Sequence, residues 1–169
     1  MFLILKFIIL ILILLICSQI GTIKAKSFTD RVDELKKVKS GLEVFRSKIE
    51  FTYEPIGEIF FEISKIIYDK KTNIFQNTIY YMKNSNVNEA WNQAVEENIC
   101  LKKEDKFTIK MFGKLLGKTD KSGQINEINV TTKLLDRLIE NAEKEREKNY
   151  KLFKTLGTTV GIGICIILI

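Results

Sequence analysis

The sequence predicts an all-α protein, a multi-helix cytoplasmic bundle flanked by N-terminal and C-terminal transmembrane helices. Three observations predict it: both ends of the 169-residue chain are apolar, the chain between them is highly charged, and its apolar residues recur at helical spacing. A single proline and few glycines favour helices joined by short turns. The predicted segments are residues 1–23 for the first transmembrane helix, 24–154 for the cytoplasmic domain and 155–169 for the second transmembrane helix.

The first apolar run, residues 7–23, contains no charged side chain. As a helix it would reach about 26 Å, close to the roughly 30 Å of a bilayer's hydrocarbon core. The alternative is a cleaved signal peptide, which would make the chain an exported helical protein with a C-terminal anchor. A signal peptide needs a shorter apolar stretch and two small residues around the cleavage site, whereas here Ala25 has Ile23 two places before it.

The second apolar run, residues 155–169, is short, but Leu152 and Phe153 lengthen it if Lys154 extends its ammonium back to the headgroups. Two of its residues, Gly157 and Gly161, have the spacing that lets another helix approach closely. This pair therefore predicts helix packing in the membrane, within one chain or in a homo-oligomer.

Lysine and arginine residues near the spans predict the orientation, because loops rich in them stay in the cytoplasm. Only Lys6 lies before the first span. The cations between the two spans and close to them are Lys24, Lys26, Arg31, Lys36, Lys37, Lys144, Arg146, Lys148, Lys151 and Lys154. We expect a protein of the cell membrane with two spans and a cytoplasmic central domain, attracted to anionic membrane lipids.

Composition argues against most enzyme classes. The chain has no histidine, the commonest general base and metal ligand. Cys17 and Cys165 lie in the spans, which leaves Cys100 alone in the middle domain. Acidic residues are plentiful but none is marked out, so we predict no catalytic residue, no metal site, no cofactor and no enzymatic activity. A nucleic-acid partner is not expected either, because no basic stripe with interleaved aromatics is present.

Helical periodicity divides the middle domain into six segments. They cover residues 27–49, 55–67, 72–83, 86–95, 103–116 and the stretch from 120 into the terminal span. Ser27 with Asp30 resembles a capping box, Pro55 suits a first helical position, and residues 79–81 would also suit a strand. In the fifth segment Phe107 is counted among the apolar positions.

Several residues have predicted local roles. Asn86 is expected to cap the helix that follows it, and the core anchors are expected to be Pro55, Ala90, Trp91 and Ala94. The acid-first spacing of Glu147 and Lys151 predicts a surface ion pair in the last helix.

The segment from Gly113 to Thr119 superficially resembles a phosphate-binding loop. That loop has four residues between its first glycine and the Gly-Lys pair, which would require a glycine where Phe112 stands. The preceding element is also predicted to be a helix rather than a buried strand. A corner between two helices explains the residues better, with Gly117 in a left-handed cap and Asp120 starting the next helix.

This corner also resembles the stage III sporulation protein AB family. The resemblance is carried by a spaced signature, Phe112, Gly113, Leu116, Gly117, Asp120 and Gln124. Further matching motifs fall in the right order along nearly the whole chain: Pro55-Ile56-x-Glu58, Ala90-Trp91-x-x-Ala94 and Leu156-Gly157. The sequence departs from the family at Glu54, where a small hydroxyl residue is usual, and at Ile59, where alanine is common.

The resemblance implies a component of the channel that joins mother cell and forespore during endospore formation. The family is expected in the mother cell's outer forespore membrane, with its helical domain in the cytoplasm. It is similar to the inner-membrane platform domains of type II secretion systems, which meet a secretion ATPase. The implied partners are a sporulation secretion-type ATPase and other proteins of the same channel complex.

Overall fold

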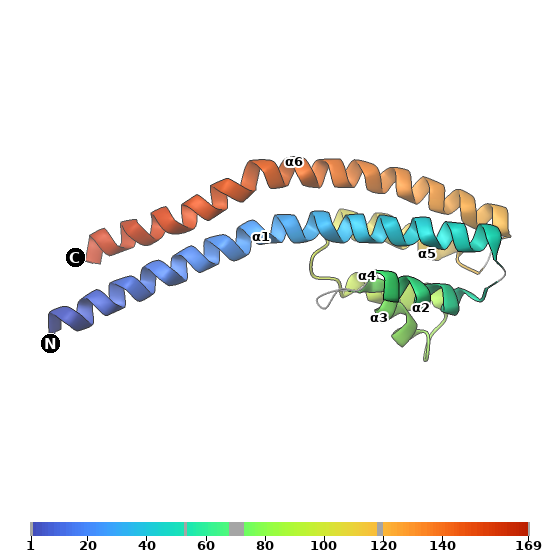
Figure 1. Ribbon diagram of the computed structural model, residues 1–169, viewed down its shortest axis with the longest axis horizontal. Helices are drawn as coiled ribbons and strands as arrows, with labels where there is room; N and C mark the ends of the chain where they lie inside the picture. Colours follow the sequence, from blue (N-terminus) through green and yellow to red (C-terminus); the bar gives the residue numbers. More distant parts are fainter. Residues whose placement is uncertain (1, 53, 68–72, 118–119, 169) are drawn as a thin grey trace. The chain divides into compact units, whose positions relative to one another are not determined.

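The computed structural model describes residues 2–52, 54–67, 73–117 and 120–168. Throughout these ranges the regular structure is helical, with no strand, which confirms the predicted all-α class (Figure 1). The helices are α1 (Phe2–Phe51), α2 (Ile56–Ile66), α3 (Ile74–Tyr81), α4 (Val87–Glu96), α5 (Lys103–Leu115) and α6 (Lys121–Leu168).

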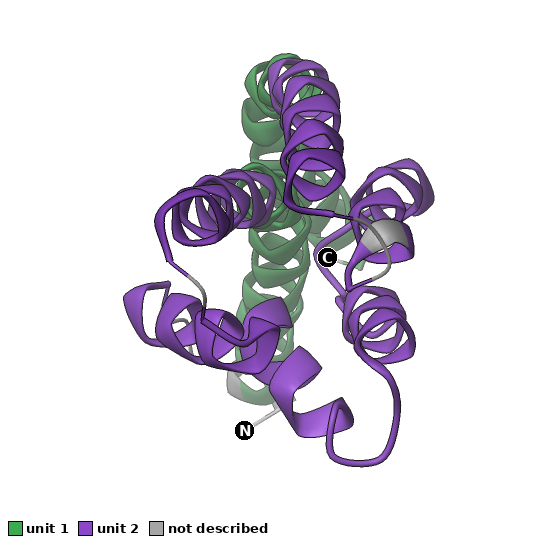
Figure 2. Ribbon diagram, turned by 90° about the vertical axis from the view of Figure 1, so that its right-hand side faces the viewer, with its two compact units in different colours: residues 1–32, 141–169 green, residues 33–140 purple. Residues whose placement is uncertain are grey.

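Two compact units make up the chain (Figure 2). Unit 1 comprises residues 1–32 and 141–169, and unit 2 comprises residues 33–140. Helices α1 and α6 each contribute one part to unit 1 and another to unit 2, whereas α2 to α5 belong to unit 2 alone.

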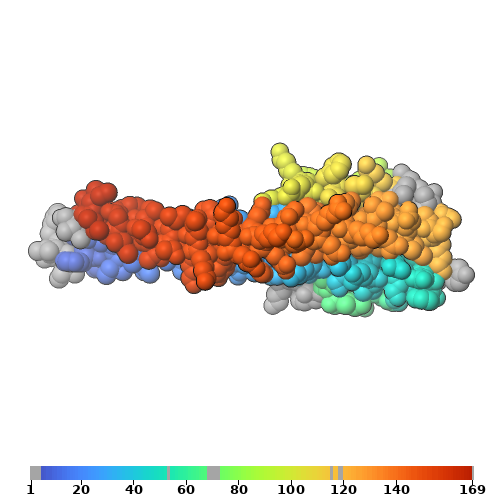
Figure 3. All heavy atoms as spheres, turned by 90° about the horizontal axis from the view of Figure 1, so that it is seen from above, coloured from blue at the N-terminus to red at the C-terminus, as the bar shows by residue number. Residues whose placement is uncertain are grey.

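Unit 1 is an antiparallel pair of helices. Along it Leu10 lies beside Cys165 and Phe28 stacks on Phe153, with ring centroids 5.6 Å apart. The start of α1 and the end of α6 consequently lie at the same end of the unit (Figure 1). The space-filling view shows the C-terminal part of α6 lying over the N-terminal part of α1 (Figure 3).

Two described helices, α1 and α6, are long and apolar enough to cross a membrane. Only 6% of the most apolar 18-residue window of each is buried, unlike the core helix of a soluble protein. The predicted second span is described as far as Leu168, where α6 ends. Helix α6 runs from Lys121 to this point without a break, as expected from the absence of a breaker in the sequence.

In unit 2, α2 and α5 pack on α1 through Phe45, which contacts Phe60 and Phe112. Helix α1 buries one stripe at three- and four-residue spacing, namely Leu35, Val38, Leu42 and Phe45. Lys39 on α1 binds Asp136 on α6, with Nζ and Oδ1 2.6 Å apart, and this hydrogen bond raises the pKa of Lys39. The apolar stripe and the ion pair together hold α1 to the rest of unit 2.

Two predicted helix starts differ from the structure. Ser27 lies inside α1, and its hydroxyl donates to the carbonyl of Lys24 instead of capping a helix. The predicted break is absent because a helix already running through the apolar segment needs no new start. Pro55 immediately precedes the first helical residue of α2, and its carbonyl accepts from the backbone N–H groups of Glu58 and Ile59.

The other predicted helices are confirmed with small shifts at their ends. Helix α3 occupies the middle of the predicted segment 72–83, whose first residue lies outside the described ranges, and the strand alternative for 79–81 is wrong. Asn86 caps α4 as predicted, since its side-chain oxygen accepts from the backbone N–H of Glu89 at 3.0 Å.

Candidate functional site

The six residues of the family signature lie around the corner between α5 and α6, in unit 2. Phe112 and Leu116 are each 2% exposed and point into the core. They share a stripe of α5 with Asp105 and Ile109, and both of these side chains are fully buried. The first half of the corner is therefore a packing surface.

Gly113 allows α4 and α5 to approach closely. A Cβ at this position would lie 2.5 Å from Cδ1 of Trp91, which is too close for any real Cβ. The Trp91 indole donates to the carbonyl of Ile109 at 2.9 Å, and the Asn88 side chain donates to the carbonyl of Gly113. The glycine, the indole and these two hydrogen bonds fix α4 against α5.

Gly117 and Asp120 turn the chain from α5 into α6. Gly117 has a φ of 70°, the left-handed conformation in which glycine is favoured. Asp120 accepts hydrogen bonds from the Ser122 hydroxyl at 2.8 Å and the Gly123 N–H at 2.9 Å, and these bonds lower its pKa. The N–H of Gln124 donates to the Asp120 carbonyl at 3.1 Å. Lys118 and Thr119, from the rejected phosphate loop, lie outside the described residues.

An aromatic cluster fills the space behind this corner. Trp91 is its centre and contacts Phe60, Phe75 and Phe112, with ring centroids 5.7, 5.6 and 5.1 Å away. Phe45 from α1 joins through Phe60 and Phe112. The sequence predicts an apolar position for each of these residues separately, but not that five helices place them together.

Of the predicted core anchors, Ala90, Trp91 and Ala94 are at most 1% exposed. The prediction is wrong for Pro55, which is exposed to solvent. Its ring stands just outside the first turn of α2, where the chain enters the helix from the surface. The residue thus guides the start of a helix and contributes no core packing.

Some polar residues are buried, which their sequence pattern does not predict. Glu34 on α1 is 3% exposed, and its carboxylate accepts from the Asn98 side chain at 2.7 Å. Asn98 in turn accepts from the N–H of Cys100 at 3.0 Å, which orders the connection between α4 and α5. The position of Glu34 next to the apolar stripe of α1 could have indicated its burial. A buried carboxylate needs a hydrogen-bond partner, which Asn98 provides.

Two large apolar side chains near the start of α5 face solvent. Ile99, in the connection between α4 and α5, is 88% exposed, and Phe107 on α5 is 67% exposed. Phe107 was predicted to lie on the apolar face of this helix. The prediction is wrong, because its side chain is exposed. Phe107 lies two residues from both Asp105 and Ile109, hence on the opposite side of the helix.

Charged residues accompany this exposed surface. Glu96, at the end of α4, binds Lys110 with Oε2 and Nζ 2.5 Å apart, and this hydrogen bond lowers the pKa of Glu96. Lys106 donates to the backbone carbonyl of Glu96 as well. Within the described residues no group of three or more His, Cys, Asp or Glu side chains could hold a metal ion. The arrangement is suited to packing and to contact with another molecule.

Gly157 and Gly161, the pair predicted to pack in the membrane, lie in unit 1. A Cβ on Gly157 would meet the Cys17 carbonyl at 2.7 Å and the Cα of Gly21 at 2.8 Å. A Cβ on Gly161 would lie 3.1 Å from Cβ of Cys17. The predicted pair therefore packs against α1 of the same chain, and Gly21 is a third small residue in this contact.

Comparison with known proteins gives three matches. A family model described as "Stage III sporulation protein AB" matches residues 6–169. The protein of that name from Bacillus subtilis (strain 168) is 24% identical over 149 residues, which cover 85% of this chain and 87% of the relative. A solved structure of stage III sporulation protein AB (SpoIIIAB) superposes with a TM-score of 0.63 at 19% identity, over 70% of this chain and 98% of that one, which shows similarity of fold.

Proposed function

Because the chain belongs to the stage III sporulation protein AB family, we propose that it is a non-enzymatic membrane scaffold of the channel between mother cell and forespore. It would dock a secretion-type ATPase through its cytoplasmic helical domain, residues 24–154. The observation that carries this proposal is the family match over residues 6–169, which confirms the resemblance inferred from the spaced motifs.

Location in the mother cell's outer forespore membrane, with two spans and a cytoplasmic centre, is part of the same proposal. Two candidate spanning helices and the cations that follow the first and precede the second support it. The alternative, an exported protein with a cleaved signal peptide, requires cutting near Ala25. Ile23, two places before this residue, is not the small residue that a cleavage site needs, which favours retention of the N-terminal segment.

The surface that would meet the ATPase is the exposed side of the α4–α5 region. Ile99 and Phe107 are apolar and project into solvent, and large apolar side chains of this kind anchor protein interfaces. Lys103 and Lys114, on the same side of α5 as Phe107, add positive charge around it. An acidic, partly apolar surface on the ATPase would complement this one.

Co-purification from sporulating cells tests the proposal. The full chain, solubilised in mild detergent, should retain the secretion-type ATPase and other channel proteins. A double variant, Ile99→Asp with Phe107→Asp, should lose the ATPase, because it places charge at the centre of the contact. The matched control, Phe61→Asp with Tyr80→Asp, changes two exposed aromatic side chains on α2 and α3 and should retain it.

Three outcomes would count against parts of this proposal. Equal ATPase recovery with both double variants would move the docking surface elsewhere. No recovery with the unaltered chain, together with normal forespore development in a deletion strain, would remove the scaffold function. Digestion of the central domain by protease added outside intact cells would favour the exported alternative.

A further inference from the structure

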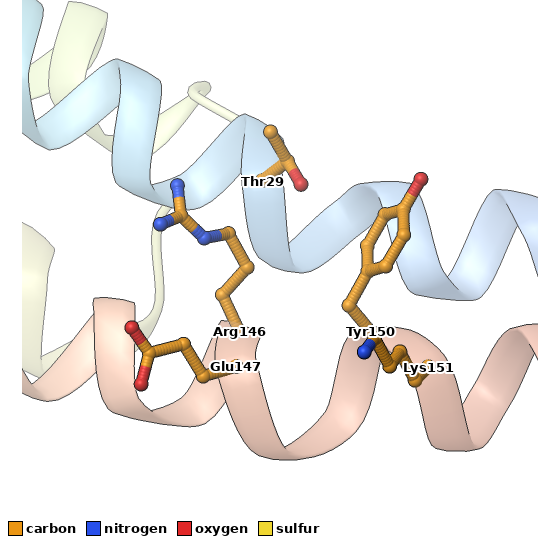
Figure 4. A pocket seen from close by; sticks show the side chains of 5 residues that line it. All are labelled: Thr29, Arg146, Glu147, Tyr150 and Lys151. Atoms are coloured by element: carbon orange, nitrogen blue, oxygen red, sulfur yellow. The ribbon is translucent and has the colours of Figure 1, made fainter.

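A cavity of about 490 Å³ opens between α1 and α6 inside unit 1 (Figure 4). It is lined by Thr29 from α1 and by Arg146, Glu147, Tyr150 and Lys151 from α6. Its size falls within the range of pockets that hold small ligands in proteins. It belongs neither to the signature corner nor to the proposed docking surface.

Four polar side chains around the cavity have no partner within the described parts of the chain. The guanidinium of Arg146 and the ammonium of Lys151 form no ion pair there, and the hydroxyls of Thr29 and Tyr150 make no hydrogen bond. The predicted pair between Glu147 and Lys151 is not formed. The four side chains can therefore serve as donors to a ligand.

The view into the cavity shows how these side chains are arranged (Figure 4). Arg146 and Tyr150 extend from α6 toward α1 and flank the space below Thr29, whereas the Glu147 carboxylate is directed away from Tyr150 and Lys151. Two cations, two hydroxyls and the Glu147 carboxylate therefore line the cavity, with the Lys151 ammonium closer to α6 than the Arg146 guanidinium. Such a donor set binds a phosphate group, since cations and O–H groups donate to its oxygens.

The cavity lies at the depth of lipid headgroups if the two apolar segments span a bilayer. Tyr150 and Lys151 precede Thr155, the start of the uncharged run of α6, by five and four residues, or about 6–8 Å along the helix. The polar layer of one leaflet is roughly 5–8 Å thick. Lys24 and Lys154, next to the apolar runs, mark the inner edge of this layer.

We propose that this cavity is a binding site for the headgroup phosphate of an acidic phospholipid, such as phosphatidylglycerol. Arg146 and Lys151 neutralise the phosphate, and Thr29 and Tyr150 donate hydrogen bonds to its oxygens. The lipid then contacts both helices of unit 1 just outside the apolar core. This inference rests on the membrane insertion in the proposed function and is independent of the ATPase contact.

Lipid retention by the full chain in detergent tests the site. Native mass spectrometry with equal amounts of phosphatidylglycerol and phosphatidylcholine should show about a tenfold preference for the acidic lipid. The double variant Arg146→Gln with Lys151→Gln should lose most of this preference. Excess inorganic phosphate should leave the bound lipid in place, because free phosphate lacks the acyl chains that hold the headgroup at this depth.

A charge-matched control separates the site from general attraction. Lys26→Gln with Lys148→Gln removes two cations close to the same spans but outside the cavity, and both side chains are exposed. This control should keep the lipid preference within about twofold of the unaltered chain. An equal loss in both double variants would overturn the proposal, as would a lack of preference in the unaltered chain.

Removing the charge of Glu147 should have the opposite effect on lipid binding from removing the two cations. Glu147→Gln removes a negative charge beside the cavity and should strengthen binding of the acidic lipid about threefold. Weaker binding in this variant would contradict the proposed arrangement. Membrane flotation of each variant distinguishes the two proposals: a chain that inserts normally but shows no lipid preference leaves the scaffold function intact, whereas failure to insert overturns both.

Discussion

In unit 1 the helices approach one another through glycines, whereas in unit 2 five large aromatic side chains fill the core. Gly21 and Gly157 bring two backbones together, while Trp91 contacts three phenylalanine rings. The proposed insertion of unit 1 in a membrane explains the contrast. In water, burial of aromatic surface stabilises the fold, whereas lipid gives no such advantage and close backbone packing takes over.

The largest effect is expected from the centre of the aromatic cluster. Trp91→Ala removes a fully buried indole and should lower the unfolding free energy of unit 2 by about 3–5 kcal/mol. This loss can be measured by urea unfolding of the full chain in detergent, monitored by circular dichroism. Tyr80→Ala, at a position that is 63% exposed, is the control and should change little. A loss similar to that of the control would show that the rings do not form the core.

A smaller effect is expected in unit 1. Gly157→Ala should weaken the helix pair by about 1–3 kcal/mol, because its Cβ would overlap the backbone of α1. Gly163→Ala is the control, since a Cβ there meets no atom within 4 Å. Disulfide formation between Cys165 and a Leu10→Cys substitution reports the pairing, because the Cys165 sulfur lies 3.4 Å from the Leu10 carbonyl. Equal yields in both glycine variants would contradict the close packing.

Helix capping in unit 2 should contribute less than the aromatic core. Asn86→Ala removes the acceptor for the Glu89 N–H and should cost about 1 kcal/mol, whereas Asn86→Asp keeps an acceptor and should cost less. Trp91 is the single tryptophan of the chain, so its fluorescence during thermal unfolding reports unit 2. Identical melting of the alanine and aspartate variants would exclude a capping role.

The smallest effect concerns pH. Hydrogen bonds from Ser122 and Gly123 hold the pKa of Asp120 below its ordinary value of 3.8, so the folded state favours the charged form. The resulting stabilisation is fully present above the unfolded pKa and is lost as the pH falls through the lower, folded value. Asp120→Asn does not titrate and should show a weaker decrease in melting temperature over this acidic range. A decrease as steep as that of the unaltered chain would assign the effect to other groups.

Helical periodicity was enough to locate the helices, because buried positions repeat along each one. Periodicity was misleading where the residue type suggests one role and the position of the residue in the fold gives it another. Ser27 has the residue type of a cap but lies inside α1, and Phe107 is apolar but lies opposite the buried stripe of α5. The meeting of Trp91 with Phe60 and Phe75 depends on how helices cross, which sequence spacing does not encode. The cavity beside Arg146 depends on the distance between two helices in the same way.

The contact of Gly21 with Gly157 also constrains biosynthesis. The whole of unit 2 separates the two glycines along the chain, so the ribosome makes the first one long before the second emerges. Under the proposed membrane insertion, the leading helix must remain in the bilayer by its own hydrophobicity while unit 2 is translated. The pairing closes only after unit 2 has been translated, and termination before Gly157 would leave the leading helix unpaired.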